Sequence, residues 1–216
     1  MSAVQHRDSR QRETADRLLS ATEQILLEQG SHSISIRRIA TLSGVNSALI
    51  SYHFGGLDAL LQQLLERNVD AICDLRDVQL AAAGKARGRE ARLEALVRAY
   101  LDPLWSTRSI HHEGSARKVI REVLPLLGAA QRRRGVARIN ESVNETARLI
   151  APLTPHLTGD QLLVRLRLLA EASNIQLQPL ARMGLFPSPG IPQDQLSQNV
   201  HAELIRMALG TLHQAG

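Results

Sequence analysis

The segment from Ser35 to Phe54 constrains the fold of this chain more than any other part of the sequence. It reads SIRRIATLSGVNSALISYHF. Ser35 is a suitable N-cap for a short helix, and Asn46 can cap a second short helix that runs from Ser47 to His53. Gly44 lies in the turn between the two helices, and this order of elements is typical of a helix–turn–helix.

The second short helix is the expected DNA-reading element. Ile39, Val45 and Ile50 would pack the motif against a preceding helix that we expect from Thr14 onward. The outer face of the second helix would then be free to enter the major groove of DNA, which is about 12 Å wide. Arg37 is the first candidate for a guanine or phosphate contact, because arginine can bond guanine through two N–H groups. The predicted DNA-binding residues are Ser35, Arg37, Arg38, Asn46, Ser47, Ala48, Leu49, Ser51, Tyr52 and His53. The alternative for these residues is a solvated surface, and for His53 a structural role.

Together with the preceding helix, this segment resembles the TetR family of bacterial transcriptional regulators over about residues 14–66. The residues that match the family pattern are Ile39, Ala40, Gly44, Val45, Asn46, Tyr52, His53, Phe54 and Leu60. Leu57 departs from the pattern, because the family often has a phosphate-binding lysine there. Ser51 departs where many members carry a tyrosine. The backbone N–H groups after Gly55 and Gly56 could bind an anion instead.

The rest of the chain predicts an all-α protein. Leu, Ala, Arg, Gln and Glu are abundant, all of them good helix formers, and no run alternates as a strand would. We expect about nine helices, with an N-terminal helix–turn–helix domain followed by a helical ligand-binding and dimerisation domain. The predicted domains are a flexible arm (1–13), the DNA-binding domain (14–66) and the effector-binding and dimerisation domain (67–216). The later predicted helices span 57–80, 89–107 with a kink or end at Pro103, 113–127, 129–151, 159–183 and 193–212.

The family resemblance implies an effector pocket and a dimer interface in the second domain. Polar clusters and aromatic residues suggest a pocket lined by Tyr100, Trp105, His111, Arg117, Arg121, Asn140, Asn144, Glu171, Asn174 and Gln178. The alternative is that these residues are solvated or join helices to one another. A basic excess between residues 85 and 138 raises an anionic effector as one option.

Leucine-rich stripes on the last two long helices suit a four-helix dimer interface. The predicted interface residues are Leu162, Leu166, Leu169, Leu204, Ile205, Ala208 and Leu212. The same stripes would also serve as core within one chain.

Several other classes of protein are disfavoured. Cys73 is the single cysteine, so no internal disulfide can form. No secretory signal or membrane-spanning run is evident, so we expect a cytoplasmic protein without membrane contact. The run His111-His112-Glu113 lacks the H-E-x-x-H zinc spacing, and Gly114-Ser115-Ala116 is no nucleophile elbow. We therefore expect neither catalysis nor a metal or cofactor.

The combined expectation is a one-component regulator. It would repress transcription by binding a palindromic operator in double-stranded DNA as a homodimer, and a small-molecule effector of unknown identity would release it. The long helix at 57–80 would couple the two sites. Two alternatives stay open: a helix–turn–helix regulator controlled by a protein partner with no small-molecule effector, or an all-helical enzyme.

Overall fold

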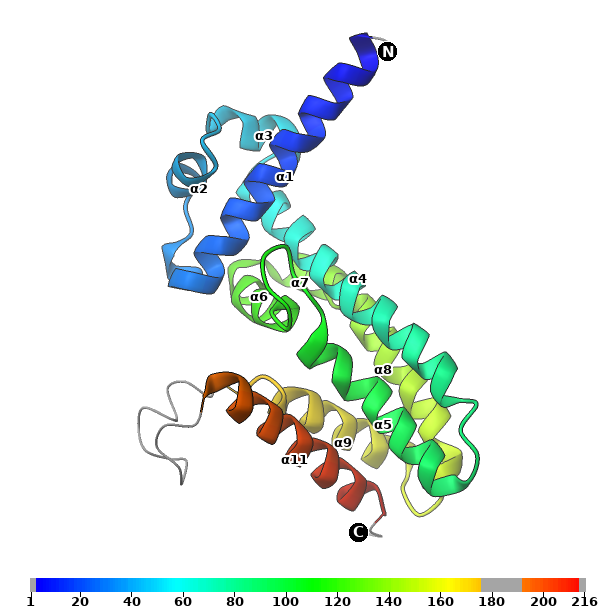
Figure 1. The fold of residues 1–216 in the computed structure, drawn as a ribbon. Coiled ribbons are helices and arrows are strands. Elements are labelled where there is room, and N and C mark those ends of the chain that lie inside the picture. Colours follow the sequence, from blue (N-terminus) through cyan, green and yellow to red (C-terminus); the bar gives the residue numbers. More distant parts are fainter. Residues whose placement is uncertain (1–2, 176–191, 214–216) are drawn as a thin grey trace. The chain divides into compact units, whose positions relative to one another are not determined.

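A computed structural model describes residues 3–175 and 192–213 of the chain. Over these residues it contains ten α-helices, α1–α9 and α11, and no strand (Figure 1). The predicted all-α class is therefore confirmed. The chain divides into two compact units: unit 1 comprises Met1–Ile72 and Thr107–Arg138, and unit 2 comprises Cys73–Ser106 and Ile139–Gly216. None of the helices in the described ranges combines the length and hydropathy that a membrane crossing requires.

Unit 1 is built around α1 (Ala3–Gln29), which contacts α2 (Ile36–Ser43), α3 (Ala48–Phe54) and α6 (Ala116–Val123). Its core is aliphatic and includes Leu18, Ile25, Ile39, Ile50, Leu61 and Val119, each at most 2% exposed. The first part of α4 (Leu57–Ala83) and α7 (Ala129–Gly135) complete the unit. Residues 107–138 thus fold with the DNA-binding segment, so the compact units differ from the predicted domains 14–66 and 67–216. The functional division at residue 66 stays a prediction.

Unit 2 contains the rest of α4 together with α5 (Arg89–Ser106), α8 (Ala137–Ile150), α9 (Gly159–Ala172) and α11 (Gln193–His213). α11 contacts both α5 and α9. Burial of the leucine-rich faces of these helices drives their packing, at about 25 cal/mol per Å² of apolar surface removed from water. The core residues include Leu93, Leu96, Tyr100, Ile150, Leu166 and Leu212.

A buried arginine joins four helices of unit 2. Arg76 on α4 donates from Nε and Nη2 to the carbonyl oxygen of Tyr100 on α5, at 3.3 and 3.1 Å, and from Nη1 to Ser142 Oγ on α8 at 3.2 Å. Its guanidinium lies 4.6 Å from the centre of the Tyr100 ring. The Tyr100 hydroxyl donates to the carbonyl oxygen of Leu166 on α9 at 2.9 Å. Burial lowers the pKa of Arg76 and raises that of Tyr100 to about 12.

The start of the first helix differs from the predicted one. α1 begins at Ala3 instead of near Thr14. The polar residues before Thr14 include no proline or glycine, so the helix can propagate back from its packed turns. The flexibility expected for residues 1–13 stays a prediction.

Three later helices also differ from prediction. The segment 129–151 is not one helix, because α7 ends at Gly135 and α8 starts at Ala137. α9 ends at Ala172 and not at 183, and 176–191 lie outside the described residues. The segment 113–127 forms a helix only over α6, followed by a 3₁₀ turn at Leu124–Leu126. In contrast, α5 passes through Pro103 and ends at Ser106, close to the predicted end.

Candidate functional site

The first helix of the motif is held by the predicted capping groups. The Ser35 side chain accepts a hydrogen bond from the backbone N–H of Arg38 at 3.3 Å. Gly44 has a left-handed backbone (φ 63°), and its N–H donates back to the carbonyls at the end of α2. This conformation favours glycine over other residues. Arg17 of α1 donates from Nη2 to the carbonyl oxygen of Ser43, so the turn is also anchored to α1. The predicted first half of the helix–turn–helix is therefore confirmed.

The second helix, α3, presents one face to solvent. Asn46 Oδ1 accepts from the backbone N–H of Ala48 at 2.9 Å, so Asn46 caps the helix as predicted. Ile50 is fully buried and fixes the rotation of α3 about its axis. Gly55 ends the helix in a left-handed conformation (φ 83°), and its N–H donates to the carbonyl oxygen of Ser51 at 2.9 Å.

The predicted DNA-binding residues gather on α2, the turn and α3, all within unit 1. Tyr52 is 65% exposed, a high value for an aromatic side chain, and His53 lies edge-on to it with ring centres 5.1 Å apart. The polar atoms of Ser35 and Asn46 are already used as helix caps, so these two residues shape the motif. Leu49 and His53 are half-buried. The exposed members are Arg37, Arg38, Asn46, Ser47, Ala48, Ser51 and Tyr52.

Sequence reasoning missed the contribution of α1 to this surface. Gln11 Nε2 donates to the Tyr52 hydroxyl at 3.2 Å, which holds the exposed tyrosine against α1. The sequence predicts a flexible arm over residues 1–13, and such an arm provides no fixed partner for Tyr52. A helical reading of that segment would have placed Gln11 two turns before Leu18, on a helix that the motif already requires.

Three residues predicted for the effector pocket belong to unit 1 and tie its segments together. His111 donates from its backbone N–H to Glu23 Oε1 at 3.0 Å, and its ring Nε2 lies 3.0 Å from Ser20 Oγ. Arg121 pairs with Glu122 at 3.1 Å. Arg117 is buried on α6, and burial together with the nearby Arg121 lowers its pKa to about 10. His111 therefore connects the loop before α6 to α1, and none of the three residues lines the pocket in unit 2.

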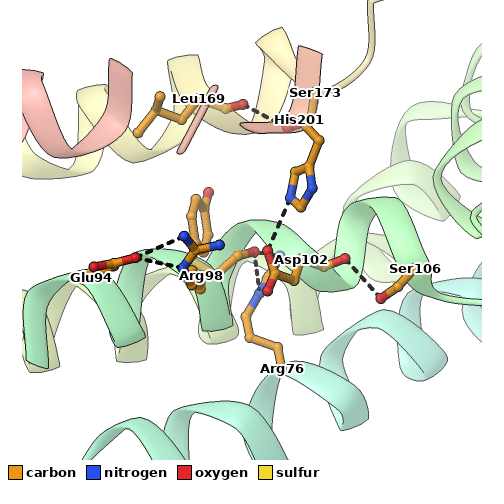
Figure 2. A network of polar contacts seen from close by, with 9 residues as sticks. Arg76, Glu94, Arg98, Asp102, Ser106, Leu169, Ser173 and His201 are labelled. Carbon is orange, nitrogen blue, oxygen red and sulfur yellow. Dashed lines mark hydrogen bonds and ion pairs between the residues drawn. The ribbon is translucent and has the colours of Figure 1, made fainter. Parts of the chain in front are cut away.

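Unit 2 holds a pocket of about 500 Å³. Its lining consists of Gln79, Asp102, Trp105, Ser106, Ser197, Gln198 and His201. Of the described residues predicted for the effector site, Trp105 lines this pocket. Asp102 and His201 were missed. Figure 2 shows His201 of α11 directed at Asp102 of α5, with Nε2 3.0 Å from Oδ1. Asp102 lies between Leu101 and Pro103, which are both buried. A carboxylate within an apolar stretch of sequence is a signal that could have identified Asp102 as a candidate site residue.

The other predicted pocket residues lie elsewhere in unit 2. Tyr100 is in the core, and Asn140 accepts from Arg167 at 3.3 Å. Asn144 is exposed on α8. Asn174 donates to Glu171 at 3.4 Å beside the end of α9. Gln178 lies outside the described residues.

The predicted dimer leucines are buried within one chain. All seven residues are at most 8% exposed. They fill unit 2, which is the alternative that the sequence left open. The same helices expose other apolar side chains: Val164 and Leu168 on α9 are 56% and 64% exposed, and Met207 on α11 is 54% exposed.

Fold and site define a class: a helix–turn–helix protein with an all-helical second unit. The model of the tetR family of bacterial regulatory proteins matches residues 18–64. The match covers the helix–turn–helix and parts of the helices on either side of it, and in this segment the chain is similar to the family.

Solved structures share the fold over nearly the whole chain. A bacterial regulatory protein of the tetR family from Rhodococcus RHA1 has a TM-score of 0.64 at 16% identity, covering 94% of this chain and 98% of that one. A TetR-family member from Streptomyces coelicolor A3 has a TM-score of 0.58 at 20% identity, covering 91% of each chain. The fatty acid degradation regulator FadR from Bacillus halodurans has a TM-score of 0.56 at 15% identity, covering 90% and 97%. No curated protein is similar to this chain in sequence.

Proposed function

We propose that the protein represses transcription as a homodimer that binds a palindromic operator and releases it when a small molecule occupies unit 2. The observation that carries the DNA-binding part is the exposed face of α2 and α3. Arg37 and Tyr52 project from two helices whose caps and buried anchors hold them in one orientation. A rigid presentation of this kind suits the major groove, because base contacts need side chains fixed within it. We expect the protein to act in the cytoplasm, where its operator DNA would lie.

The Lys that the family often carries after the recognition helix is replaced by Leu57. Gly55 and Gly56 precede α4, and Leu60 donates its backbone N–H to the carbonyl oxygen of Gly56 at 3.1 Å. The N–H groups before Leu60 in the first turn of α4 have no such partner within the helix, as at every helix start. We propose that these backbone groups bind the phosphate that a lysine would otherwise contact.

The exposed apolar side chains of α9 and α11 support the proposed homodimer. Val164 and Leu168 lie one helical turn apart on α9, and Met207 lies on α11. Large apolar side chains that gather on an exposed face can mark an interaction site. A two-fold dimer would set the two recognition helices about 34–36 Å apart, the spacing of one DNA turn. The buried leucines would then form the core behind the interface.

Release requires that the effector bind the two conformations of the dimer with different affinities. The pocket of about 500 Å³ in unit 2 falls in the usual size range of small-molecule sites. α4 runs as one helix from Leu57, after the recognition helix, to Ala83, and Gln79 of this helix lines the pocket. We propose that occupancy of the pocket changes the position of α4.

The test is selection of bound sequences from random duplex DNA with the full-length protein at fixed salt. An enriched palindrome is the expected result and would supply the operator for every later assay. A reporter gene placed behind this operator should be less active when the protein is present, and increased activity would make the protein an activator. Failure of a folded dimer to enrich any sequence, in the presence or absence of cell-extract small molecules, would contradict the proposal. A regulator controlled by a protein partner would bind the palindrome and would remain bound to it when those small molecules are added.

A further inference from the structure

The pocket of unit 2 has one acidic side chain. Among its described lining residues, Asp102 is the only carboxylic acid and His201 is the only basic side chain. The side chains of Asp102 and His201 are 31% and 24% exposed, so a molecule in the pocket can reach both. The chemistry of Asp102 therefore decides which charge a ligand can carry.

Polar atoms in the pocket need a hydrogen-bonding partner. Gln79 Oε1, Asp102 Oδ1 and His201 Nε2 are buried atoms that make no hydrogen bond to any group in the described part of the chain. The approach of His201 Nε2 to Asp102 Oδ1, 3.0 Å, meets the distance of an ion pair but not the geometry of a hydrogen bond. Buried polar groups are normally hydrogen-bonded. Two of the three atoms are oxygen acceptors, so a ligand that supplies N–H donors would satisfy them once the two side chains rotate toward the pocket.

In the described part of the chain, Asp102 forms no ion pair with an arginine. Arg76 of α4 is committed to the Tyr100 carbonyl and to Ser142. Arg98 of α5 pairs with Glu94 at 2.8 Å, one turn before Asp102 (Figure 2). Arg206 of α11 pairs with Glu203. An anion would therefore meet a carboxylate that no arginine neutralises, whereas a cation would be attracted to it.

The walls of the pocket favour a flat ligand. The rings of Trp105 and His201 lie stacked, with centres 5.3 Å apart and planes inclined by 30°. A tryptophan face attracts cations as well as other flat rings. A metal ion fits less well, because the described residues contain no group of three His, Cys, Asp or Glu side chains that could hold one.

We propose that this pocket binds a flat organic monocation, such as an aryl amidinium or aryl ammonium. Its N–H groups donate to Asp102 and Gln79, and its ring lies against Trp105. This inference rests on the regulator function proposed above, in which the cation is the effector. The basic residues that raised an anionic effector at the level of sequence do not line the pocket: Arg117, Arg121 and the arginines of α7 belong to unit 1.

Three isosteric probes separate charge from shape. Benzamidinium, benzamide and benzoate share one ring and one planar head group but carry charges of +1, 0 and −1. The chain contains one tryptophan, Trp105, so its indole N–H gives a single NMR signal from the pocket itself. With the full-length dimer at pH 7.5, benzamidinium should shift this signal in a saturable way. Benzamide should bind about tenfold more weakly, and benzoate should cause no shift at the same concentrations.

A pair of charge-neutralising variants tests the role of Asp102. Asp102→Asn should reduce benzamidinium affinity about tenfold while leaving that of benzamide unchanged. Glu90→Gln is the matched control, because it also neutralises a carboxylate on α5, at an exposed residue outside the pocket. It should leave all three affinities unchanged. The comparison of the three probes on the unaltered protein needs no variant, so it holds even if Asp102→Asn fails to fold.

Each result decides the proposal. Equal affinity for benzamidinium and benzamide, preferred binding of benzoate, or the absence of any benzamidinium shift would overturn it. Selection of an operator from random DNA is a separate readout. Operator binding without benzamidinium binding would overturn the cation site and leave the regulator function intact. Benzamidinium binding without operator binding would overturn the regulator function and leave the cation site intact.

Discussion

The side-chain amide of Gln11 on α1 donates a hydrogen bond to the hydroxyl of Tyr52 on α3, with a separation of 3.2 Å. Through this contact, α1 helps to orient Tyr52, a side chain that we propose to contact DNA. Tyr52 can therefore act in two ways: by contacting DNA itself, or by docking α3 on α1. The two roles predict different effects of substitution.

Tyr52→Phe should reduce operator affinity about tenfold, because the phenyl ring keeps its packing but loses a hydrogen bond to a charged phosphate. Gln11→Ala removes only the contact with α1 and should change affinity much less. Fluorescence anisotropy with the selected operator measures both variants. Equal losses in the two variants would mean that Tyr52 acts through α1 and not on DNA. An unchanged affinity for Tyr52→Phe would remove Tyr52 from the site.

Arg37→Ala should weaken operator binding by about 1–3 kcal/mol if the guanidinium reads a guanine. The loss would then be confined to sequences that carry that base. If Arg37 instead binds a phosphate, all sequences should weaken alike, and the slope of log affinity against log salt should fall by about one. Arg133→Ala, an exposed arginine of α7 in the same unit, is the control and should change neither quantity. Loss of affinity in both variants would indicate a general electrostatic effect.

The motif could be predicted from sequence because its determinants are local. The Ser35 cap, the Gly44 turn and buried Ile50 lie within one short segment, and each acts on its immediate neighbours. The Asp102–His201 contact is different, because it joins two helices that are distant in sequence. Nothing in a single sequence says which polar residue of α11 meets α5.

Leucine patterns were ambiguous for a related reason. Helical spacing of apolar residues predicts burial, but not whether the covering surface belongs to the same chain or to a second copy. Leu166 and Leu168 are the same residue type on the same helix, and only packing makes the first fully buried and the second 64% exposed. The break between α7 and α8 was missed because Gly135 interrupts an otherwise helical pattern without a proline.

Gly135→Ala should destabilise unit 1. A Cβ at this position would overlap Leu65 Cδ2 and lie 3.1 Å from Leu65 Cγ and 3.3 Å from Gln62 Nε2. Leu65 is fully buried and cannot move without displacing its neighbours. The overpacking cost, about 1–3 kcal/mol, exceeds the gain of about 1 kcal/mol that alanine brings to a helix. Urea unfolding measures the difference. Gly210→Ala on α11 is the control, because nothing lies within 4 Å of its Cβ, and it should be neutral or stabilising. A stabilised Gly135→Ala variant would show that α7 can move away from α4.

Tyr100 should make the fold lose stability at high pH. Burial raises its pKa to about 12, above the value of about 10 expected in the unfolded chain. The folded state therefore holds the phenol proton more tightly. The resulting stability is fully present below about pH 10 and is lost as pH rises toward 12, by roughly 2–3 kcal/mol.

Tyr100→Phe should remove this part of the pH dependence, although it also loses the hydrogen bond to Leu166. Arg117 opposes the effect, because its pKa is lowered to about 10 and its deprotonation favours the folded state above that pH. Comparing unfolding curves of the two proteins at pH 9 and pH 11.5 isolates the phenol. An identical pH dependence in the variant would show that Tyr100 ionises as readily in the folded state as in the unfolded one.

Leu168→Glu should dissociate the homodimer. The side chain is 64% exposed in one chain, so the substitution leaves the core of unit 2 intact. In a two-fold interface each change appears twice, and two carboxylates would be buried against apolar partners and near each other. Sedimentation at micromolar concentration should find a folded monomer, and operator affinity should fall with it because one head cannot span both half-sites. Val78→Glu introduces the same charge at an apolar residue of α4 that is 69% exposed, and it should remain dimeric. If Leu168→Glu stays dimeric while Val78→Glu dissociates, the dimer face includes α4 and not the exposed side of α9.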